Sequence, residues 1–226
     1  MRVRRFATWV IPTLFIGGAA YLFGYSDLIQ VKSISIYPEA EVNRIQSVIE
    51  KPIFNIRTGA HLARVNVRGA ESALKNIGWV EKASVSRNWI SGKVSISIVS
   101  RKAIARVITD GAAESSLIDL NGFIYSDPEV TDSLPQISIA DSNMSNLAAS
   151  FITQIPADLT GQMQSLSLTS DGNFLMKLAL PSKKGPDLMV RWGNIGELQT
   201  KLQVYEKLIA LPENKSISAI DLSEPK

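Results

Sequence analysis

The chain has 226 residues, with 24 Lys and Arg against 21 Asp and Glu, one His and no Cys. Without cysteine there is no disulfide framework, no thiolate nucleophile and no cysteine-based metal site, so a body outside the cytoplasm must be held together by its core. The surplus charge is carried by Arg2, Arg4 and Arg5, because residues 26–226 hold 21 basic and 21 acidic residues. A net-neutral body shows no overall surplus of basic residues of the kind that nucleic-acid binding requires, which excludes nucleic acid as a partner.

A run of apolar residues follows these arginines at positions 6–25. As a helix it would rise about 30 Å, close to the thickness of the hydrocarbon core of a bilayer. The positive-inside rule then predicts a short cytoplasmic tail at residues 1–5, a transmembrane helix at residues 6–25 and an extracytoplasmic C-terminus. The sequence therefore predicts a single-pass protein of the cell inner membrane. The alternative is a cleaved signal peptide with its small residues at 17–20, which would leave a secreted soluble protein.

The sequence of residues 26–101 predicts a small α+β unit. Residues 31–37 alternate apolar and polar side chains, which is typical of a half-buried strand, and residues 39–50 carry apolar side chains at helical spacing. Asn66 is a candidate N-cap for a second helix. Two strands follow at residues 80–89 and 93–99. The expected order is β-α-α-β-β, which buries enough apolar surface to fold as a unit of residues 26–101.

The remaining residues, 102–226, predict mostly strands. The Asn121-Gly122 pair between apolar runs is the strongest short hairpin signal in the chain. Helical spacing is confined to residues 145–155 and 197–211. The expected strands lie at residues 105–109, 116–120, 123–125, 165–169, 174–180, 187–192 and 216–222. We therefore expect an α+β protein whose second domain is a mostly antiparallel β domain with flanking helices.

The residue types and motifs that enzymes use for catalysis are mostly missing from the sequence, so we predict no enzyme. His61 is the single histidine, so it lacks the partners that a nucleophilic triad or a nitrogen-rich zinc site requires. The chain has no G-x-S-x-G elbow and no P-loop. We expect no catalytic, metal-binding or cofactor-binding residues, no cofactor and no small-molecule substrate. For Trp79, Trp89 and Trp192 the strand-edge positions favour packing, with an interface role open for Trp89.

A pattern of apolar and aromatic residues with one arginine runs through the first predicted hairpin, at Trp79, Val80, Ala83, Val85, Arg87 and Trp89. It resembles the POTRA module of the FtsQ/DivIB family of bacterial cell-division proteins, which has a Leu-Pro-Trp-Val run followed by Ala-x-Val-x-Arg-x-Trp-Pro. Further matches follow in order at residues 99–101, 117–119, 134–135, 193–201 and 220–222. The resemblance implies a POTRA domain at residues 26–101, in which the residues of the pattern are mainly structural, and an extracytoplasmic β domain at residues 102–226.

The resemblance also implies a function. The protein would be a single-pass membrane scaffold of the divisome, recruiting and linking division proteins at the septum, with FtsB/DivIC-like and FtsL-like proteins and the septal wall synthase complex as partners. An exposed last strand at residues 216–222 could accept a strand from a partner, with Ser218, Ile220 and Leu222 on the contacting face. The alternative is that these are ordinary core residues of a strand.

Two other functions remain open at this point. POTRA modules also occur in envelope transport and assembly components, but about 120 residues with a helix at 197–211 are too few and wrongly patterned for the barrel that follows the module there. An exported hydrolase would depend entirely on His61.

Overall fold

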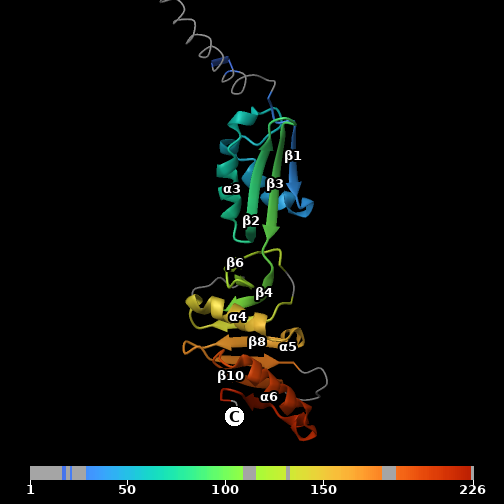
Figure 1. Ribbon diagram of the computed structural model, residues 1–226, viewed down its shortest axis with the longest axis vertical. Helices are drawn as coiled ribbons and strands as arrows, with labels where there is room; N and C mark the ends of the chain where they lie inside the picture. Colours follow the sequence, from blue (N-terminus) through green and yellow to red (C-terminus); the bar gives the residue numbers. More distant parts are fainter. Residues whose placement is uncertain are drawn as a thin grey trace, which may run out of the picture. The chain divides into compact units, whose positions relative to one another are not determined.

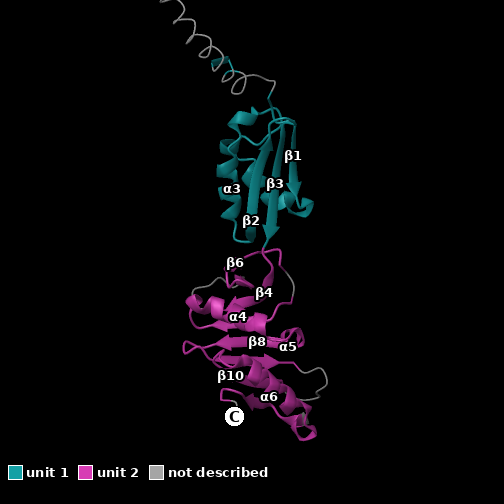
Figure 2. Cartoon of the chain, viewed as in Figure 1, with its two compact units in different colours: residues 1–100 teal, residues 101–226 magenta. Residues whose placement is uncertain are grey.

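The computed structural model describes residues 17, 18, 21, 29–108, 116–130, 133–179 and 187–224. Two compact units make up the chain, residues 1–100 and residues 101–226 (Figure 2). The predicted cytoplasmic tail and, apart from three positions, the predicted transmembrane helix lie outside the described residues. Among the helices that are described, none has the length and apolar character needed to cross a membrane.

The first unit is a three-stranded sheet with two helices on one face (Figure 1). Strand β1 runs parallel to β3, and β2 runs antiparallel to β3, which gives the sheet order β1-β3-β2. The predicted order β-α-α-β-β is confirmed. The elements are β1 (Ser33–Tyr37), α2 (Val42–Ile49), α3 (Val67–Lys75), β2 (Val80–Asn88) and β3 (Lys93–Ser100), with 3-10 turns at Glu39–Glu41, Pro52–Phe54 and Leu62–Arg64.

Local sequence explains how these elements begin and which side they bury. Asn66 caps α3, since its side-chain oxygen accepts a hydrogen bond of 3.0 Å from the main-chain nitrogen of Gly69. The predicted cap is therefore confirmed. Strand β3 alternates buried and more exposed residues, as a sheet with helices on one face requires. The inward side chains from the helices and strands form the core of the unit, including Ile45, Leu62, Leu74, Val94 and Ile96.

The second unit is built on one sheet in the order β11-β10-β9-β8-β7-β4-β5-β6. Its strands are β4 (Ala103–Ile108), β5 (Ser116–Asp119), β6 (Ile124–Ser126), β7 (Gln136–Ile139), β8 (Met163–Leu168), β9 (Phe174–Leu178), β10 (Leu188–Gly193) and β11 (Ala219–Asp221). Its helices are α4 (Ser145–Gln154), α5 (Ala157–Gln162) and α6 (Leu198–Ala210), with 3-10 turns at Ser142–Met144 and Pro212–Ser216. The predicted hairpins around Asn121-Gly122 and residues 170–173 are confirmed.

The sheet is mixed, and this corrects the prediction of a mostly antiparallel domain. Among the described strands, β4 and β8 both run parallel to β7, and β10 runs parallel to β11. Parallel neighbours need long crossovers, and helices α4 and α5 connect β7 to β8 while α6 connects β10 to β11. Strand β7 and helix α5 were not predicted from the sequence.

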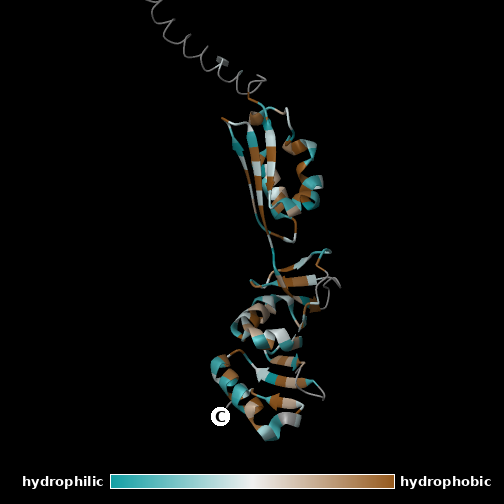
Figure 3. Cartoon of the chain, turned by 90° about the vertical axis from the view of Figure 1, so that its right-hand side faces the viewer, coloured by the Kyte–Doolittle hydropathy of each residue, from teal (hydrophilic) through white to brown (hydrophobic). Residues whose placement is uncertain are grey.

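Helices cover one face of the larger sheet and leave the other face to solvent (Figure 3). In β9 and β10 buried residues alternate with more exposed ones such as Lys177 and Arg191. On the covered face Phe151 of α4 stacks on Phe174 of β9 with ring centroids 4.1 Å apart, and its ring meets Trp192 edge-on at 5.9 Å. This aromatic cluster packs α4 against β9 and β10.

Candidate partner-binding edge

Strand β11 lies at the end of the larger sheet and pairs on one side with β10. The main-chain nitrogen of Met189 donates to the oxygen of Ser218 at 2.9 Å, and the nitrogen of Leu222 donates to the oxygen of Arg191 at 2.7 Å. Because main-chain groups alternate in direction along a strand, the N–H and C=O groups of Ala219 point away from β10. The same holds for Asp221, so among the described strands these groups have no neighbour on the outer side.

The three residues predicted for the contacting face differ in burial and in position relative to β11. Ile220 and Leu222 are buried and belong to the core cluster under the helices. Ser218 is exposed and precedes the strand, which begins at Ala219 rather than at residue 216. The side chains of Ile220 and Leu222 therefore face inward, as the core interpretation expected, and the outward side chains of β11 are those of Ala219 and Asp221.

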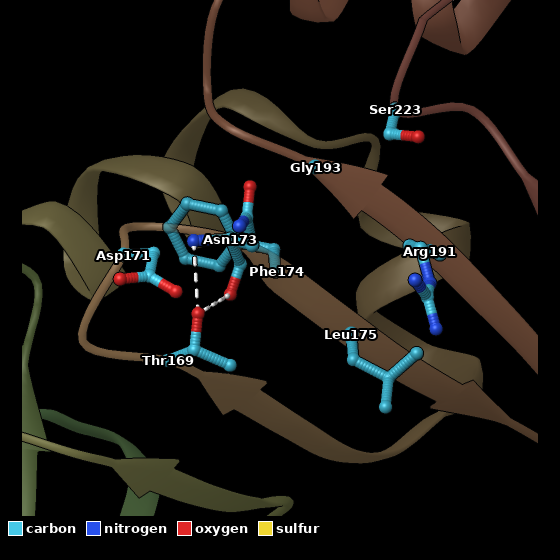
Figure 4. Close-up of a pocket in the computed structure, with 8 residues that line it drawn as sticks. All are labelled: Thr169, Asp171, Asn173, Phe174, Leu175, Arg191, Gly193 and Ser223. Carbon is cyan, nitrogen blue, oxygen red and sulfur yellow. Dashed lines mark hydrogen bonds between the residues drawn. The ribbon is translucent and has the colours of Figure 1, made fainter.

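A hollow of about 370 Å³ lies beside this edge, where the β8–β9 turn meets the ends of β10 and β11 (Figure 4). The turn is closed by Thr169, whose hydroxyl accepts a hydrogen bond of 3.3 Å from the main-chain nitrogen of Asn173. On the facing strands Arg191 is paired in register with Leu175. The full lining consists of Thr169, Asp171, Asn173, Phe174, Leu175, Arg191, Gly193 and Ser223.

The end of β11 carries a fixed negative charge. The carboxylate of Asp221 accepts hydrogen bonds from the hydroxyl of Ser223 at 2.6 Å and from its main-chain nitrogen at 3.0 Å. These bonds, together with Arg191 whose Nε lies 3.8 Å away, hold the pKa of Asp221 below its ordinary value. The edge thus presents a carboxylate and a guanidinium side by side on its exposed face.

Lys201 of α6 binds the main chain at the end of β10, the strand next to the edge. It is 2% exposed, and its ammonium donates to the main-chain oxygens of Trp192 at 2.7 Å and Asn194 at 2.8 Å. Burial lowers the pKa of Lys201, an effect that nearby Glu197 opposes. These bonds tie the loop after β10 to the helix that leads into β11. Sequence reasoning placed this lysine in a matched region but did not predict its burial, because lysine is a surface residue by default.

Four of the six residues of the predicted signature lie in the core of the first unit. Trp79, Val80, Ala83 and Val85 are buried, and Trp79 lies under the guanidinium of Arg44 at 3.7 Å. Their positions fit packing.

The other two signature residues lie near the β2–β3 turn. The guanidinium of Arg87 donates to the main-chain oxygens of Leu62, Ala63 and Val65 at 2.9, 3.2 and 3.1 Å. It also lies 4.6 Å from the ring of Trp89, which is 43% exposed. Arg87 is therefore a clamp between strand β2 and the loop before α3.

A buried ion pair lies near the start of the second unit. Arg101 donates to the carboxylate of Asp119 at 2.6 Å and stacks on the ring of Phe123 at 3.9 Å. The other oxygen of Asp119 accepts from the main-chain nitrogens of Asn121 and Phe123 at 2.8 and 2.9 Å. Asp119 thus organises the predicted Asn-Gly hairpin.

The described residues offer little for metal chemistry. Within the described ranges no three His, Asp or Glu side chains lie close enough to hold a metal ion. His61 pairs through its main chain with Gln30 in an isolated bridge, and its Nδ1 is buried without a hydrogen-bond partner among those residues. The position of His61 is consistent with a packing role.

Comparison with protein families accounts for the second unit. A family model described as the C-terminal part of the cell division protein FtsQ/DivIB matches residues 105–223, more than half of the chain. The chain belongs to the FtsQ/DivIB family of cell-division proteins. The FtsQ/DivIB resemblance and the assignment to cell division are thereby confirmed. A comparison with curated protein sequences gave no match.

The FtsQ/DivIB match covers the whole candidate edge. It begins in β4 and ends at Ser223, two residues after β11, so it spans the eight-stranded sheet, the hollow and Lys201. The family consists of non-catalytic division proteins.

Proposed function

We propose that this FtsQ/DivIB-family protein is a single-pass membrane scaffold that recruits and links other division proteins at the septum. Residues 1–5 would be cytoplasmic, residues 6–25 would span the inner membrane, residues 26–101 would form a POTRA domain and residues 102–226 an extracytoplasmic β domain. The partners would be FtsB/DivIC-like and FtsL-like proteins and the septal wall synthase complex. Anchoring confines these partners to a thin layer beside the membrane, where weak contacts suffice.

The observation that carries the proposal is the outer side of β11. An edge strand with unpaired main-chain groups is a template for a strand from another chain. Ala219 and Asp221 direct these groups outward, and β11 is held to β10 by its other side. Added main-chain hydrogen bonds would supply affinity, and side chains meeting the neighbouring hollow would supply specificity.

The charges at the edge favour a particular kind of strand. Asp221 and Arg191 lie on the exposed face with opposite signs. A partner strand carrying a basic side chain opposite Asp221 would gain a cross-strand pair of about 0.2–1 kcal/mol. The alternating side chains of such a strand would cover Met189 and Ala219 on the same face.

A proline substitution at Ala219 tests the edge. Proline removes an outward N–H and leaves the bonds to β10 that Ser218 and Leu222 make. We expect the Ala219→Pro variant to lose co-purification of the FtsB/DivIC-like protein from dividing cells while its unfolding midpoint stays close to that of the parent. The matched control, Ala219→Val, keeps the N–H and should retain the partner. Equal retention of the partner by both variants would reject the edge.

Localisation tests the scaffold role separately. A fluorescent protein fused to the cytoplasmic end should form a band at mid-cell in dividing cells, and uniform labelling of the envelope would contradict recruitment to the septum. The mass of the mature chain decides between anchor and signal peptide, because cleavage after residues 17–20 would remove the N-terminal segment.

A further inference from the structure

The turn between β2 and β3 exposes two large apolar side chains next to each other. Ile90 is 95% exposed and Trp89 is 43% exposed. Isolated exposed apolar residues are common on protein surfaces, but an adjacent aromatic and branched aliphatic pair at the tip of a hairpin is a candidate contact surface. We call residues 89–92 the apolar turn.

The apolar turn has a fixed conformation. The side-chain oxygen of Asn88 accepts hydrogen bonds from the main-chain nitrogens of Ile90 and Ser91 at 2.9 and 3.0 Å. Gly92 closes the turn with φ +71°, a left-handed conformation that favours glycine, and donates to the main-chain oxygen of Asn88 at 2.9 Å. The turn therefore presents Ile90 on a rigid support.

Arg87 extends this support to Trp89. Its guanidinium is held by three main-chain oxygens of residues 62–65 and lies against the indole ring. The ring of Trp89 is thus backed on one side by a cation that is itself fixed to the unit. The signature pattern, whose residues were expected to be mainly structural, therefore also places the indole of Trp89 at the surface.

The apolar turn lies at the end of the unit where the chain arrives from its N-terminal part (Figure 1). The main-chain nitrogen of Lys32 donates to the oxygen of Gly92 at 2.8 Å. In the sequence the apolar run ends at Tyr25, seven residues before Lys32. Even a fully extended chain spans at most about 3.6 Å per residue, so about 25 Å separates Lys32 from the end of that run at the greatest reach.

Positive charge surrounds the turn. Residues 29–33, 57–64 and 87–93 meet at this end of the unit, joined by hydrogen bonds between residues 29–32 and residues 59–62 and 92. These three segments contain no Asp or Glu. Their cations are Lys32, Arg57, Arg64, Arg87 and Lys93. Glu50 lines a hollow together with Arg57, and the other carboxylates of the described part of the unit are Glu39, Glu41, Glu71 and Glu81, outside these three segments.

We propose that the apolar turn docks on the membrane surface, with Trp89 and Ile90 at the boundary between headgroups and acyl chains and the surrounding cations on anionic headgroups. Indole rings prefer this boundary, and long basic side chains reach from it to the headgroups. Basic residues next to a membrane gain attraction to anionic lipid that adds to the apolar contact. The inference rests on the proposed function in one respect, that residues 6–25 anchor the chain. Docking would fix how the first unit stands on the bilayer.

A spin label tests the docking in the full chain reconstituted into vesicles. The chain has no cysteine, so Ile90→Cys creates one labelling site, at a side chain whose exposure leaves folding unaffected. The matched control is Val99→Cys near the other end of β3, where Val99 is 47% exposed. In vesicles of phosphatidylcholine with phosphatidylglycerol, we expect the label at position 90 to collide with dissolved oxygen several-fold more, relative to a water-soluble nickel chelate, than the label at position 99.

The outcomes separate docking from anchoring. Flotation of the chain with the vesicles reports anchoring alone, and a chain that stays at the bottom of the gradient overturns both the anchor and the docking that depends on it. A chain that floats while both labels collide equally with the nickel chelate overturns docking and leaves the anchor intact. In pure phosphatidylcholine the difference between the two labels should shrink, and an unchanged difference would overturn the part assigned to the cations. Ile90→Cys and Val99→Cys should unfold like the parent, which a denaturant titration verifies.

Discussion

The ammonium of Lys201 donates a hydrogen bond of 2.7 Å to the main-chain oxygen of Trp192. The indole of Trp192 is fully buried in the aromatic cluster, and Trp192 is the second-last residue of β10, the strand that pairs with β11. A cation from α6 therefore holds the turn between β10 and α6 from inside the unit. Because Trp192 belongs to β10 and β10 pairs with β11, this bond supports the strand next to the candidate edge.

Replacement of Lys201 by alanine should destabilise the second unit by about 3 kcal/mol, because the buried carbonyl oxygen of Trp192 and the partly buried one of Asn194 lose their donor and the buried methylenes leave a cavity. Denaturant unfolding measures the loss. The control is Lys207→Ala on the same helix, an exposed position where the change should stay within about 0.5 kcal/mol. Similar stabilities for the two variants would show that the carbonyl bonds of Lys201 contribute nothing.

Tyr205 should make the second unit sensitive to alkaline pH. Burial raises the pKa of Tyr205 to about 12, with a smaller contribution from Asp158. The unfolded chain releases this proton near pH 10, before the folded chain does, so stability present below pH 10 is lost as pH rises toward 12. A two-unit difference in pKa corresponds to about 1.4 kcal/mol lost by pH 11.

Tyr205→Phe tests that contribution. The hydroxyl of Tyr205 has no hydrogen-bond partner among the described residues, so its removal at pH 7 should cost nothing or stabilise by up to about 1 kcal/mol. Between pH 9 and 11 the variant should lose less stability than the parent. Equal losses in the two proteins, measured by denaturant titration at each pH, would contradict the assignment to this residue.

Replacement of Asp119 by alanine should cost about 3–5 kcal/mol, since it leaves the guanidinium of Arg101 without its buried carboxylate. It also removes the acceptor for the main-chain nitrogens of Asn121 and Phe123. Asp171→Ala, at an exposed position in the β8–β9 turn, provides the comparison and should change stability by less than about 0.5 kcal/mol. Thermal unfolding of the two variants distinguishes a structural ion pair from a surface charge.

Gly92→Ala and Gly59→Ala form a matched pair in the first unit, because both glycines have positive φ. A Cβ at Gly59 meets no atom within 4 Å, whereas a Cβ at Gly92 would lie 2.5 Å from the main-chain oxygen of Gln30. We expect about 1–2 kcal/mol of destabilisation for Gly59→Ala from the backbone alone, and a clearly larger loss for Gly92→Ala. Equal losses in chemical denaturation would show that residues 30–32 do not pack against the turn.

Much of the first unit follows from local sequence. Asn66 begins a helix because its side chain accepts from the main chain one turn later, and the alternation in residues 93–99 marks the face that packs against the helices. In the second unit the Asn121-Gly122 pair predicts its hairpin because glycine adopts the positive φ that the turn requires, +77° at Gly122. These features depend on residues that are close in the chain.

Other features depend on partners that are distant in the chain. Strand β7 has four residues, and it becomes a strand because β4 and β8 pair with it on both sides. Its Gln-Ile-Ser-Ile alternation is too short to predict a strand without those neighbours. The same reason explains why the sheet was predicted as mostly antiparallel, since strand direction depends on which strands become neighbours.

The sequence by itself determined the family resemblance, the strand and helix order of the first unit and the separation of a charged start from a neutral body. Only the tertiary structure decided that Ile220 and Leu222 face the core, that Ala219 and Asp221 form the outer side of the last strand, and that Lys201 is buried beneath it. Local periodicity sets which side chains share a face, whereas the packing of α6 and the pairing with β10 decide which face is covered.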